Sequence, residues 1–443
     1  MRKCLFLGYG GGHINTLIPV IKELQKFDIE IEVIGINLAV EILRRNGIPC
    51  KSLASYMDDE TLSIGLPLAR KFHTFGSPVS YADSIAYYGF SMKDLIEEYG
   101  NELAQKIFNI YDRRLFLPVK TMKDILAKEK PNIVVVTTMY RFELATVIAA
   151  KEMGIMSIKV EDLLGRLLKP FPDKIHVDSD EDREKLINQG INPNKIVLKS
   201  ELENSEIVAV LEKVYNLACT TQATKFSVLC DYTKNNLVKR GIDADSIEIT
   251  GQPAFDSLIE YKDVNKHTVI KSFKLNPDKR VVTYMSQPLV CRENVLRGLV
   301  SAMKDHEDKQ LIIKLHPNED GIVHKNILKE FNYEALVIKD RPAPLLSYIS
   351  DLVITISSTT GLEAVILDKP LLTINLTNEE DVIPFNEMGI GMGVYCKEDI
   401  STAIDKMFQD EKLQKELCNN RKKFENDGKA ASRVANLIVD MVR

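Results

Sequence analysis

The first stretch that could do chemistry is the N-terminal "CLFLGYGGGH", in which an apolar run meets glycines and then His13. Glycine at a strand-to-helix turn lets the backbone approach a bound group, and the following helix N-terminus attracts anions, so Gly11 and Gly12 are predicted to touch a ligand. The positive end of the helix dipole disfavours protonation of His13, and a neutral imidazole suits a general base. A histidine that only caps the helix would occupy the same position.

The stretch "LIIKLHPNED" places Lys314 and His316 two residues apart where an apolar strand ends. Side chains two apart share one side of a strand. An ammonium and an imidazole together can meet a phosphate as charge and hydrogen-bond donor. A solvated strand end would have the same residues, so this pair is informative only beside other segments.

The stretch "VITISSTTGLEAVILDKPLLTI" combines small hydroxyl residues at a strand-to-helix turn with Glu363 in the first helical turn. Backbone N–H groups and hydroxyls at such a turn can form an anion cradle. Glu363 could stabilise the helix electrostatically, or it could accept two hydroxyls of a ribose. Phosphate-type donors and a diol-type acceptor therefore occur together here; the hydroxyl residues are Ser357, Ser358, Thr359 and Thr360.

These stretches belong to a chain in which short β-branched apolar runs alternate with helical periodicity, a pattern typical of βαβ units. At 443 residues the chain exceeds one comfortable hydrophobic core. The sequence predicts an α/β fold with two Rossmann-like, doubly wound domains facing a cleft, where ligands bind at the carboxyl ends of the strands. The predicted domains are residues 1–255 and 256–425, followed by a helix at 426–443 that packs across them.

A helical insertion rich in Tyr and Phe, at about residues 55–120, interrupts the first domain. It predicts either a subdomain that packs its own aromatic side chains or a surface that recognises a second substrate.

Composition excludes several classes of protein. A net charge of −5 and a pI near 5.9 do not favour a nucleic acid as partner. Seven scattered cysteines, an N-terminus without a secretory signal and the lack of a 20-residue apolar run predict a reduced cytoplasmic protein. Peripheral contact with the inner face of a membrane and a homodimer both stay open.

Together the segments resemble the GT-B glycosyltransferase superfamily and its relatives, the UDP-N-acetylglucosamine 2-epimerases. "GGGHINTLIPVIKEL" is similar to the opening loop of nucleotide-sugar glycosyltransferases, and "ITGQPAFDSL" resembles a "TGNP…D" turn common to both groups. "KLHP" and "SST" are similar to motifs of bacterial capsule and polyol-phosphate transferases.

The resemblance implies an inverting glycosyltransferase that works on a surface polysaccharide or other glycoconjugate. His13 would be the base that deprotonates the acceptor hydroxyl, and Glu363 would hold the donor ribose. Lys314, His316 and the 357–360 turn would stabilise the departing phosphate, and Gln287 completes the set of donor-binding candidates. No cofactor or metal is expected, since no acidic metal cluster is apparent. The implied partners are a UDP- or CMP-linked sugar and a glycan or lipid-linked acceptor.

Two other classes stay open. "MGIMSIKVEDLLGR" resembles the "H-V-E-A-G-L-R" stretch of the epimerases, with Glu161 in place of a functional glutamate, so Glu161 is a second catalytic candidate. Their "H-R-R-E" signature has no clear counterpart, because the strand "VVTYMS" continues into "QPLVCREN" without a histidine. The remaining class is a non-catalytic module that binds a nucleotide sugar.

Overall fold

The computed structural model describes residues 2–162, 164–165, 175–188, 196–198, 200, 205–289, 291–377, 380–424 and 426–443. The chain divides into two compact units, Met1–Ala254 with Ala430–Arg443 (unit 1) and Phe255–Lys429 (unit 2). Each unit is described by itself below.

Unit 1 is built on a parallel sheet of seven strands in the order β3-β2-β1-β4-β5-β8-β9. The order reverses direction at β1, as in a doubly wound fold, which confirms the predicted class for this unit. The strands are β1 (Arg2–Tyr9), β2 (Ile29–Ile36), β3 (Lys51–Ser52), β4 (Ile133–Val136), β5 (Met156–Val160), β8 (Lys225–Val228) and β9 (Ile247–Ile249).

Both faces of this sheet are buried. Along β1, Leu5 and Leu7 contribute to one apolar cluster, whereas Cys4 and Phe6 point to the opposite face and join another. The helices outside the insertion are α1 (Gly12–Leu24), α2 (Leu38–Arg45), α7 (Arg141–Glu152), α10 (Ser205–Thr220), α11 (Asp231–Lys239) and α19 (Ala430–Val442). A small separate sheet joins β6 (Ile175–Val177) to β7 (Ile196–Leu198) beside α8 (Asp180–Asn188), and η4 (Ala244–Ser246) precedes β9.

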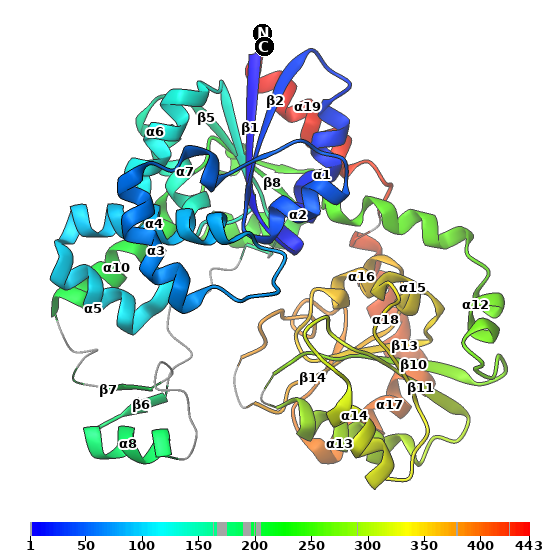
Figure 1. Cartoon of the computed structure of the whole chain (residues 1–443). Coiled ribbons are helices and arrows are strands. Elements are labelled where there is room, and N and C mark those ends of the chain that lie inside the picture. Colours follow the sequence, from blue (N-terminus) through cyan, green and yellow to red (C-terminus); the bar gives the residue numbers. More distant parts are fainter. Residues whose placement is uncertain are drawn as a thin grey trace. The chain divides into compact units, whose positions relative to one another are not determined.

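The last helix, α19, returns to unit 1 and packs along α1, so that the two chain ends lie together (Figure 1). Val434, Ala435 and Ile438 of α19 are fully buried in the same cluster as Leu17 and Ile21 of α1. The C-terminal helix therefore covers the same face of the sheet as α1, the helix that follows the glycine-rich turn.

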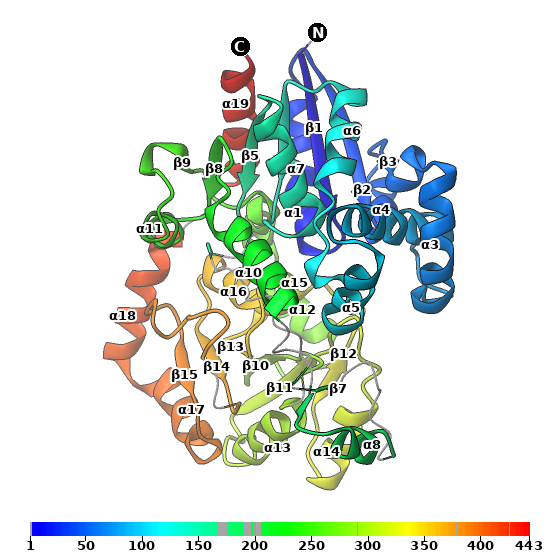
Figure 2. The same ribbon diagram turned by 90° about the vertical axis from the view of Figure 1, so that its left-hand side faces the viewer.

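The insertion is helical and packs its aromatic side chains inward. Tyr87, Phe108 and Phe116 are nearly inaccessible, and the rings of Phe108 and Phe116 stack with centroids 5.5 Å apart. Its elements are η1 (Leu53–Tyr56), α3 (Asp59–Phe72), α4 (Tyr81–Tyr99), α5 (Asn101–Tyr111), η2 (Asp112–Leu115) and α6 (Val119–Glu129). α3 and α4 lie side by side at one end of the unit 1 sheet, next to β3 (Figure 2).

Unit 2 contains a parallel sheet of six strands in the order β12-β11-β10-β13-β14-β15, again doubly wound. Its strands are β10 (Arg280–Met285), β11 (Lys309–Lys314), β12 (Leu336–Ile338), β13 (Leu352–Thr355), β14 (Leu371–Ile374) and β15 (Met392–Val394). Its helices are α12 (Lys266–Ser272), α13 (Arg292–Met303), α14 (Ile322–Glu330), α15 (Ala343–Ile349), α16 (Thr360–Ile366), α17 (Ile400–Gln409) and α18 (Glu411–Arg421), with η5 (Pro253–Asp263), η6 (Lys397–Asp399) and η7 (Lys422–Phe424).

Three properties expected from composition can be compared with the structure. All seven cysteines are free. Within the described ranges, no helix is long and apolar enough to cross a bilayer. Among the same residues, no group of three or more His, Cys, Asp and Glu side chains is arranged to hold a metal ion.

The packing of α3 on α4 gives a stability prediction. A Cβ on Gly89 would lie 2.2 Å from the carbonyl oxygen of Thr61, so the two helices must separate to accept a side chain. Gly89→Ala is expected to lower the free energy of unfolding by about 1–3 kcal/mol, the usual cost of overpacking. Denaturant unfolding measures this change. The exposed Ser63→Ala on α3 is the control, and equal midpoints for the two variants would contradict the close helix contact.

Candidate functional site

The candidate site of unit 1 lies where its central parallel strands end. β1 ends at Tyr9, β2 at Ile36, β4 at Val136 and β5 at Val160. Since these strands are parallel, the loops that follow them all leave from one edge of the sheet. That edge collects the glycine turn and His13 together with side chains from the β2, β4 and β5 loops.

The glycine turn is required by backbone geometry. Gly11 has φ +76°, a conformation that side chains disfavour, and it precedes the first residue of α1. A Cβ on Gly10 would lie 2.4 Å from the Cβ of Leu38, so only glycine lets this loop pass the start of α2. Gly12 has no neighbour within 4 Å of its Cβ position, so this side of the turn is open.

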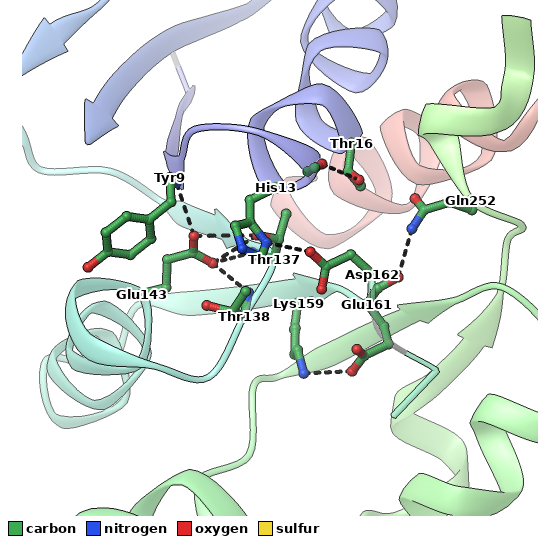
Figure 3. A network of polar contacts seen from close by, with 11 residues as sticks. Tyr9, His13, Thr16, Thr137, Thr138, Glu143, Lys159, Glu161, Asp162 and Gln252 are labelled. Atoms are coloured by element: carbon green, nitrogen blue, oxygen red, sulfur yellow. Dashed lines mark hydrogen bonds and ion pairs between the residues drawn. The ribbon is translucent and has the colours of Figure 1, made fainter. Parts of the chain in front are cut away.

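His13 is paired with Asp162, which follows β5. The Nδ1 of His13 lies 2.5 Å from an Oδ of Asp162, and the His13 side chain is about one third exposed (Figure 3). An ionised carboxylate can only accept, so Nδ1 carries the proton and Nε2 can accept one. Burial lowers the pKa of His13, but the hydrogen bond and charge of Asp162 outweigh it, so the pKa is raised above its ordinary 6.5. The expectation that the helix dipole disfavours protonation of His13 is therefore wrong, because it did not include the carboxylate of Asp162.

Glu143 fixes the backbone around this pair. Its buried carboxylate accepts the N–H groups of Thr137 at 2.7 Å, Thr138 at 2.5 Å and Tyr9 at 3.3 Å (Figure 3). These residues end β1 and follow β4, so a single carboxylate joins two neighbouring loops. Burial raises the pKa of Glu143, while the charge of His13 and the donated N–H groups oppose the rise.

Glu161, the second catalytic candidate, does not meet His13. Its carboxylate pairs with Lys159 at 2.6 Å, and both side chains are almost completely buried. Its backbone N–H donates to Ser227, and its carbonyl accepts from Gln252 of the "TGQP" turn (Figure 3). Glu161 thus anchors the end of β5, and the next residue, Asp162, is the carboxylate beside His13.

A cavity of about 390 Å³ opens beside His13. Its walls come from the loops after β1, β2 and β4: Tyr9, Gly10, Gly11, His13, Asn37, Leu38, Thr138, Tyr140 and Arg141. The predicted contact residue Gly11 lines this cavity.

In unit 2, Gln287 and the 357–360 turn come together. The Gln287 side-chain oxygen accepts the N–H of Ser357 at 2.8 Å, which joins the loop after β10 to the loop after β13. The Ser358 hydroxyl accepts the N–H of Thr360 at 3.2 Å. Thr359 precedes the first residue of α16, and the buried hydroxyl of Thr360 has no partner in the described part of the chain.

Lys314 and His316 lie at the end of β11, at the same edge of the unit 2 sheet. The Lys314 ammonium donates to the carbonyls of Leu315 and Lys339, at 2.8 and 3.0 Å, and burial lowers its pKa. Glu319 holds the loop by accepting the N–H of His316 at 2.8 Å, and Arg292 pairs with the same carboxylate at 3.1 Å.

Glu363 lies in α16, and its carboxyl group is harder to ionise than an exposed one. Burial raises its pKa to about 7, and the charge of Lys314 only partly opposes the rise. Its buried Oε2 has no hydrogen-bond partner among the described residues. A buried oxygen of this kind is satisfied when a ligand hydroxyl donates to it.

Sequence reasoning missed Asp162, Glu143 and Arg141. Alternation along β5 gives one usable signal: Lys159 and Glu161 share a face, so Asp162 must point to the other. Nothing in the sequence marks Glu143, because its role depends on which loops its carboxylate reaches.

The fold and both sites can now be compared with known proteins. The sequence profile of the UDP-N-acetylglucosamine 2-epimerase family matches residues 209–439, just over half of the chain. The chain therefore belongs to the UDP-N-acetylglucosamine 2-epimerase family. The matched range includes Lys314, His316 and Glu363, and it begins after His13 and Asp162.

The processive diacylglycerol beta-glucosyltransferase of Bacillus licheniformis is 26% identical over 208 residues, which are 45% of this chain and 52% of that protein. The chain thus matches about half the length of this curated relative. Among solved structures, the UDP-GlcNAc 2-epimerase of Neisseria meningitidis bound to UDP-GlcNAc superposes with a TM-score of 0.59 at 15% identity, covering 99% and 100% of the two chains. The calicheamicin glycosyltransferase CalG4 gives 0.58 at 12%, covering 100% and 98%. These similarities confirm the GT-B fold.

The His13–Asp162 pair predicts a change in titration. Asp162→Asn is expected to lower the pKa of His13, because the carboxylate is what holds it above 6.5. In the wild type, the pair stabilises the fold fully below pH 6.5, and this stabilisation is lost as the pH rises through the raised pKa. NMR titration of the imidazole measures both variants. Asp28→Asn removes an exposed carboxylate elsewhere in unit 1 as the control, and an unchanged His13 midpoint in Asp162→Asn would disprove the coupling.

Glu363 predicts a pH-dependent gain in stability. A carboxyl group whose pKa rises from 4.5 to about 7 on folding destabilises the fold once it ionises. Glu363→Gln is therefore expected to raise the free energy of unfolding by about 1–3 kcal/mol at pH 8 and to change it little at pH 5. Glu330→Gln, which removes an exposed carboxylate paired with Arg297, is the control without such a gain. Equal effects of Glu363→Gln at both pH values would contradict the raised pKa.

Proposed function

We propose that the protein acts on UDP-N-acetylglucosamine or a close relative as a 2-epimerase or hydrolase. Membership of the family supports the substrate class. The observation that carries the catalytic part is the His13–Asp162 pair, a base with a fixed tautomer beside an open cavity at the carboxyl edge of unit 1.

Epimerisation at C2 requires that the C2–H bond is broken and formed again on the other face of the ring. That hydrogen becomes acidic only when C1 gains positive charge, which happens as the nucleotide leaves. The Nε2 of neutral His13 removes the proton, and Asp162 stabilises the imidazolium that results. Loss of UDP from C1 and of the proton from C2 leaves a double bond between these carbons. Return of a proton to the opposite face of C2, with UDP adding again at C1, gives the epimer, whereas water adding at C1 in place of UDP gives the free sugar.

Unit 2 is assigned to nucleotide recognition. Glu363 accepts the ribose hydroxyls at its unpartnered oxygen, and Lys314 and His316 contact the phosphates. The 357–360 turn, held by Gln287, supplies further donors. We assign stabilisation of the leaving group to these side chains and not to a metal ion.

Glycosyl transfer is the second candidate function. Two observations favour it: His13 follows a glycine turn of the kind that resembles nucleotide-sugar glycosyltransferases, and one curated relative is a glucosyltransferase. Here His13 would deprotonate an acceptor hydroxyl, and UDP would be released only when an acceptor is present.

The proposal predicts turnover of UDP-N-acetylglucosamine alone. In D₂O with EDTA present, NMR is expected to show the C2 epimer or the free sugar with deuterium at C2. His13→Asn should lower kcat by about 10²–10⁴-fold, the usual contribution of a general base. His267→Asn, an exposed histidine of unit 2, is the control and should retain full activity.

The alternatives give different results in the same assay. No reaction without an acceptor, but UDP release when glycan or lipid-linked acceptors are added, would replace epimerisation by transfer. Turnover that depends on added Mg²⁺ would contradict the metal-independent mechanism. Nucleotide binding without turnover under any of these conditions would leave a binding module.

A further inference from the structure

We propose that the His13 cavity continues into a neighbouring pocket of the insertion and that together they bind a second ligand, an anionic sugar whose charged group is held by Arg141. This inference rests on the proposed function, which gives nucleotide recognition to unit 2. It adds a binding site in unit 1 for a phosphate- or carboxylate-bearing sugar other than the nucleotide.

The first observation is a concentration of backbone strain around the cavity. Among the described residues, eight that are not glycine have a positive φ, and two of them, Asn37 at +54° and Arg141 at +49°, line this one cavity. Gly11, at +76°, lines it as well. Strained backbone that the surrounding structure holds in place gathers at ligand sites. Arg141 is therefore held in an unfavourable backbone conformation in the wall of this cavity.

The second observation is that Arg141 lacks an ion-pair partner. Within the part of the chain that the structure describes, no carboxylate lies within 4.0 Å of its guanidinium, although the residue is only partly exposed. Its guanidinium carbon lies 6.0 Å from the centroid of the Tyr9 ring, a cation–π contact that does not neutralise the charge.

No carboxylate of the described residues forms an ion pair with Arg141. The charge of Asp112 helps to raise the pKa of Arg141, and the Asp112 carboxylate lies 3.8 Å from Arg113. Asp162 is paired with His13, and Glu143 accepts three backbone N–H groups. The Arg141 guanidinium thus has no ion pair among the described residues, and its planar fork fits a carboxylate or phosphate.

The third observation is that two cavities share part of their walls. A pocket of about 240 Å³ shares Asn37 and Leu38 with the His13 cavity and extends into the insertion. Leu38, at the boundary, is 42% exposed. The wall of this pocket adds Phe72, Tyr87 and Tyr88, together with the pair His73–Ser84, whose Nδ1 and Oγ lie 2.8 Å apart, and Arg113.

The chemistry of these walls selects the ligand class. Aromatic rings and an exposed leucine suit the apolar face of a sugar ring, and the His73–Ser84 pair and Asn37 can bond to its hydroxyls. Arg141 in one wall and Arg113 in the other both favour a ligand that carries a negative group. A neutral sugar would leave the charge of Arg141 without a partner.

The test is calorimetric titration of the full chain with glucose 6-phosphate, glucuronate, glucose and UDP. The two anionic sugars are expected to bind the wild type and Glu363→Ala alike, and at least 10-fold more weakly to Arg141→Asn. Asparagine tolerates a positive φ, so this variant is expected to fold with an unchanged or higher Tm. Arg70→Gln, which removes an exposed charge from the insertion outside both pockets, is the control and should bind normally.

UDP shows whether Arg141 binds the phosphate of the nucleotide or the charged group of a separate sugar. It is expected to bind Arg141→Asn normally and Glu363→Ala at least 10-fold more weakly. If Arg141→Asn weakens UDP as much as the sugars, Arg141 serves the nucleotide and the second-ligand site is overturned. It is also overturned if neither anionic sugar binds the wild type at about 10 mM, or if glucose binds as well as they do.

Should Arg141→Asn not fold, Arg141→Lys takes its place. This variant keeps the charge and loses the planar fork, so it must show an intermediate loss of affinity for the anionic sugars. Failure of UDP to bind the wild type would contradict the proposed function while leaving the Arg141 result intact.

Discussion

The geometry of unit 1 depends on the buried carboxylate of Glu143. It lies in the first turn of α7 and accepts N–H groups at the ends of β1 and β4, so it satisfies backbone donors that the sheet itself cannot pair. Losing it would leave several buried donors without an acceptor, each at a cost of about 1–3 kcal/mol. The loops that carry His13 and Arg141 are therefore fixed relative to each other before any ligand binds.

In both units, a buried side chain accepts backbone N–H groups of the loops at the carboxyl edge of the sheet. In unit 1, Glu143 joins the loops after β1 and β4. In unit 2, Glu319 holds the backbone of His316, and Gln287 holds that of Ser357. Parallel strands bring the loops to one edge, but they do not fix the loop conformations. Buried side chains that accept backbone N–H groups do so, and they free the exposed residues of the same loops to meet ligands.

The family relationship and the site of unit 1 bear on different parts of the reaction. The matched range contains the candidate nucleotide-binding residues and begins beyond the His13 turn. The substrate class is thus supported by the second half of the chain, whereas the choice between epimerisation and transfer depends on what His13 deprotonates. The cavity next to His13 is the feature of unit 1 on which this choice depends, because both reactions place a sugar beside His13 and only transfer needs room for a second one.

The sequence by itself determined the elements and the fold class. The predicted alternation of short apolar runs and helices appears in both halves of the chain: "IEIEVIGI" forms β2, and the stretch from "KRVVTYMS" to "PLLTINL" contains β10 to β14. Local apolar periodicity decides such elements, and it is readable residue by residue. Only the tertiary structure decided that Asp162 and not Glu161 meets His13, and that Arg141 lines the same cavity. Those contacts join residues more than 100 positions apart, and they depend on strand order, on the face each side chain takes and on strained backbone, none of which local sequence encodes.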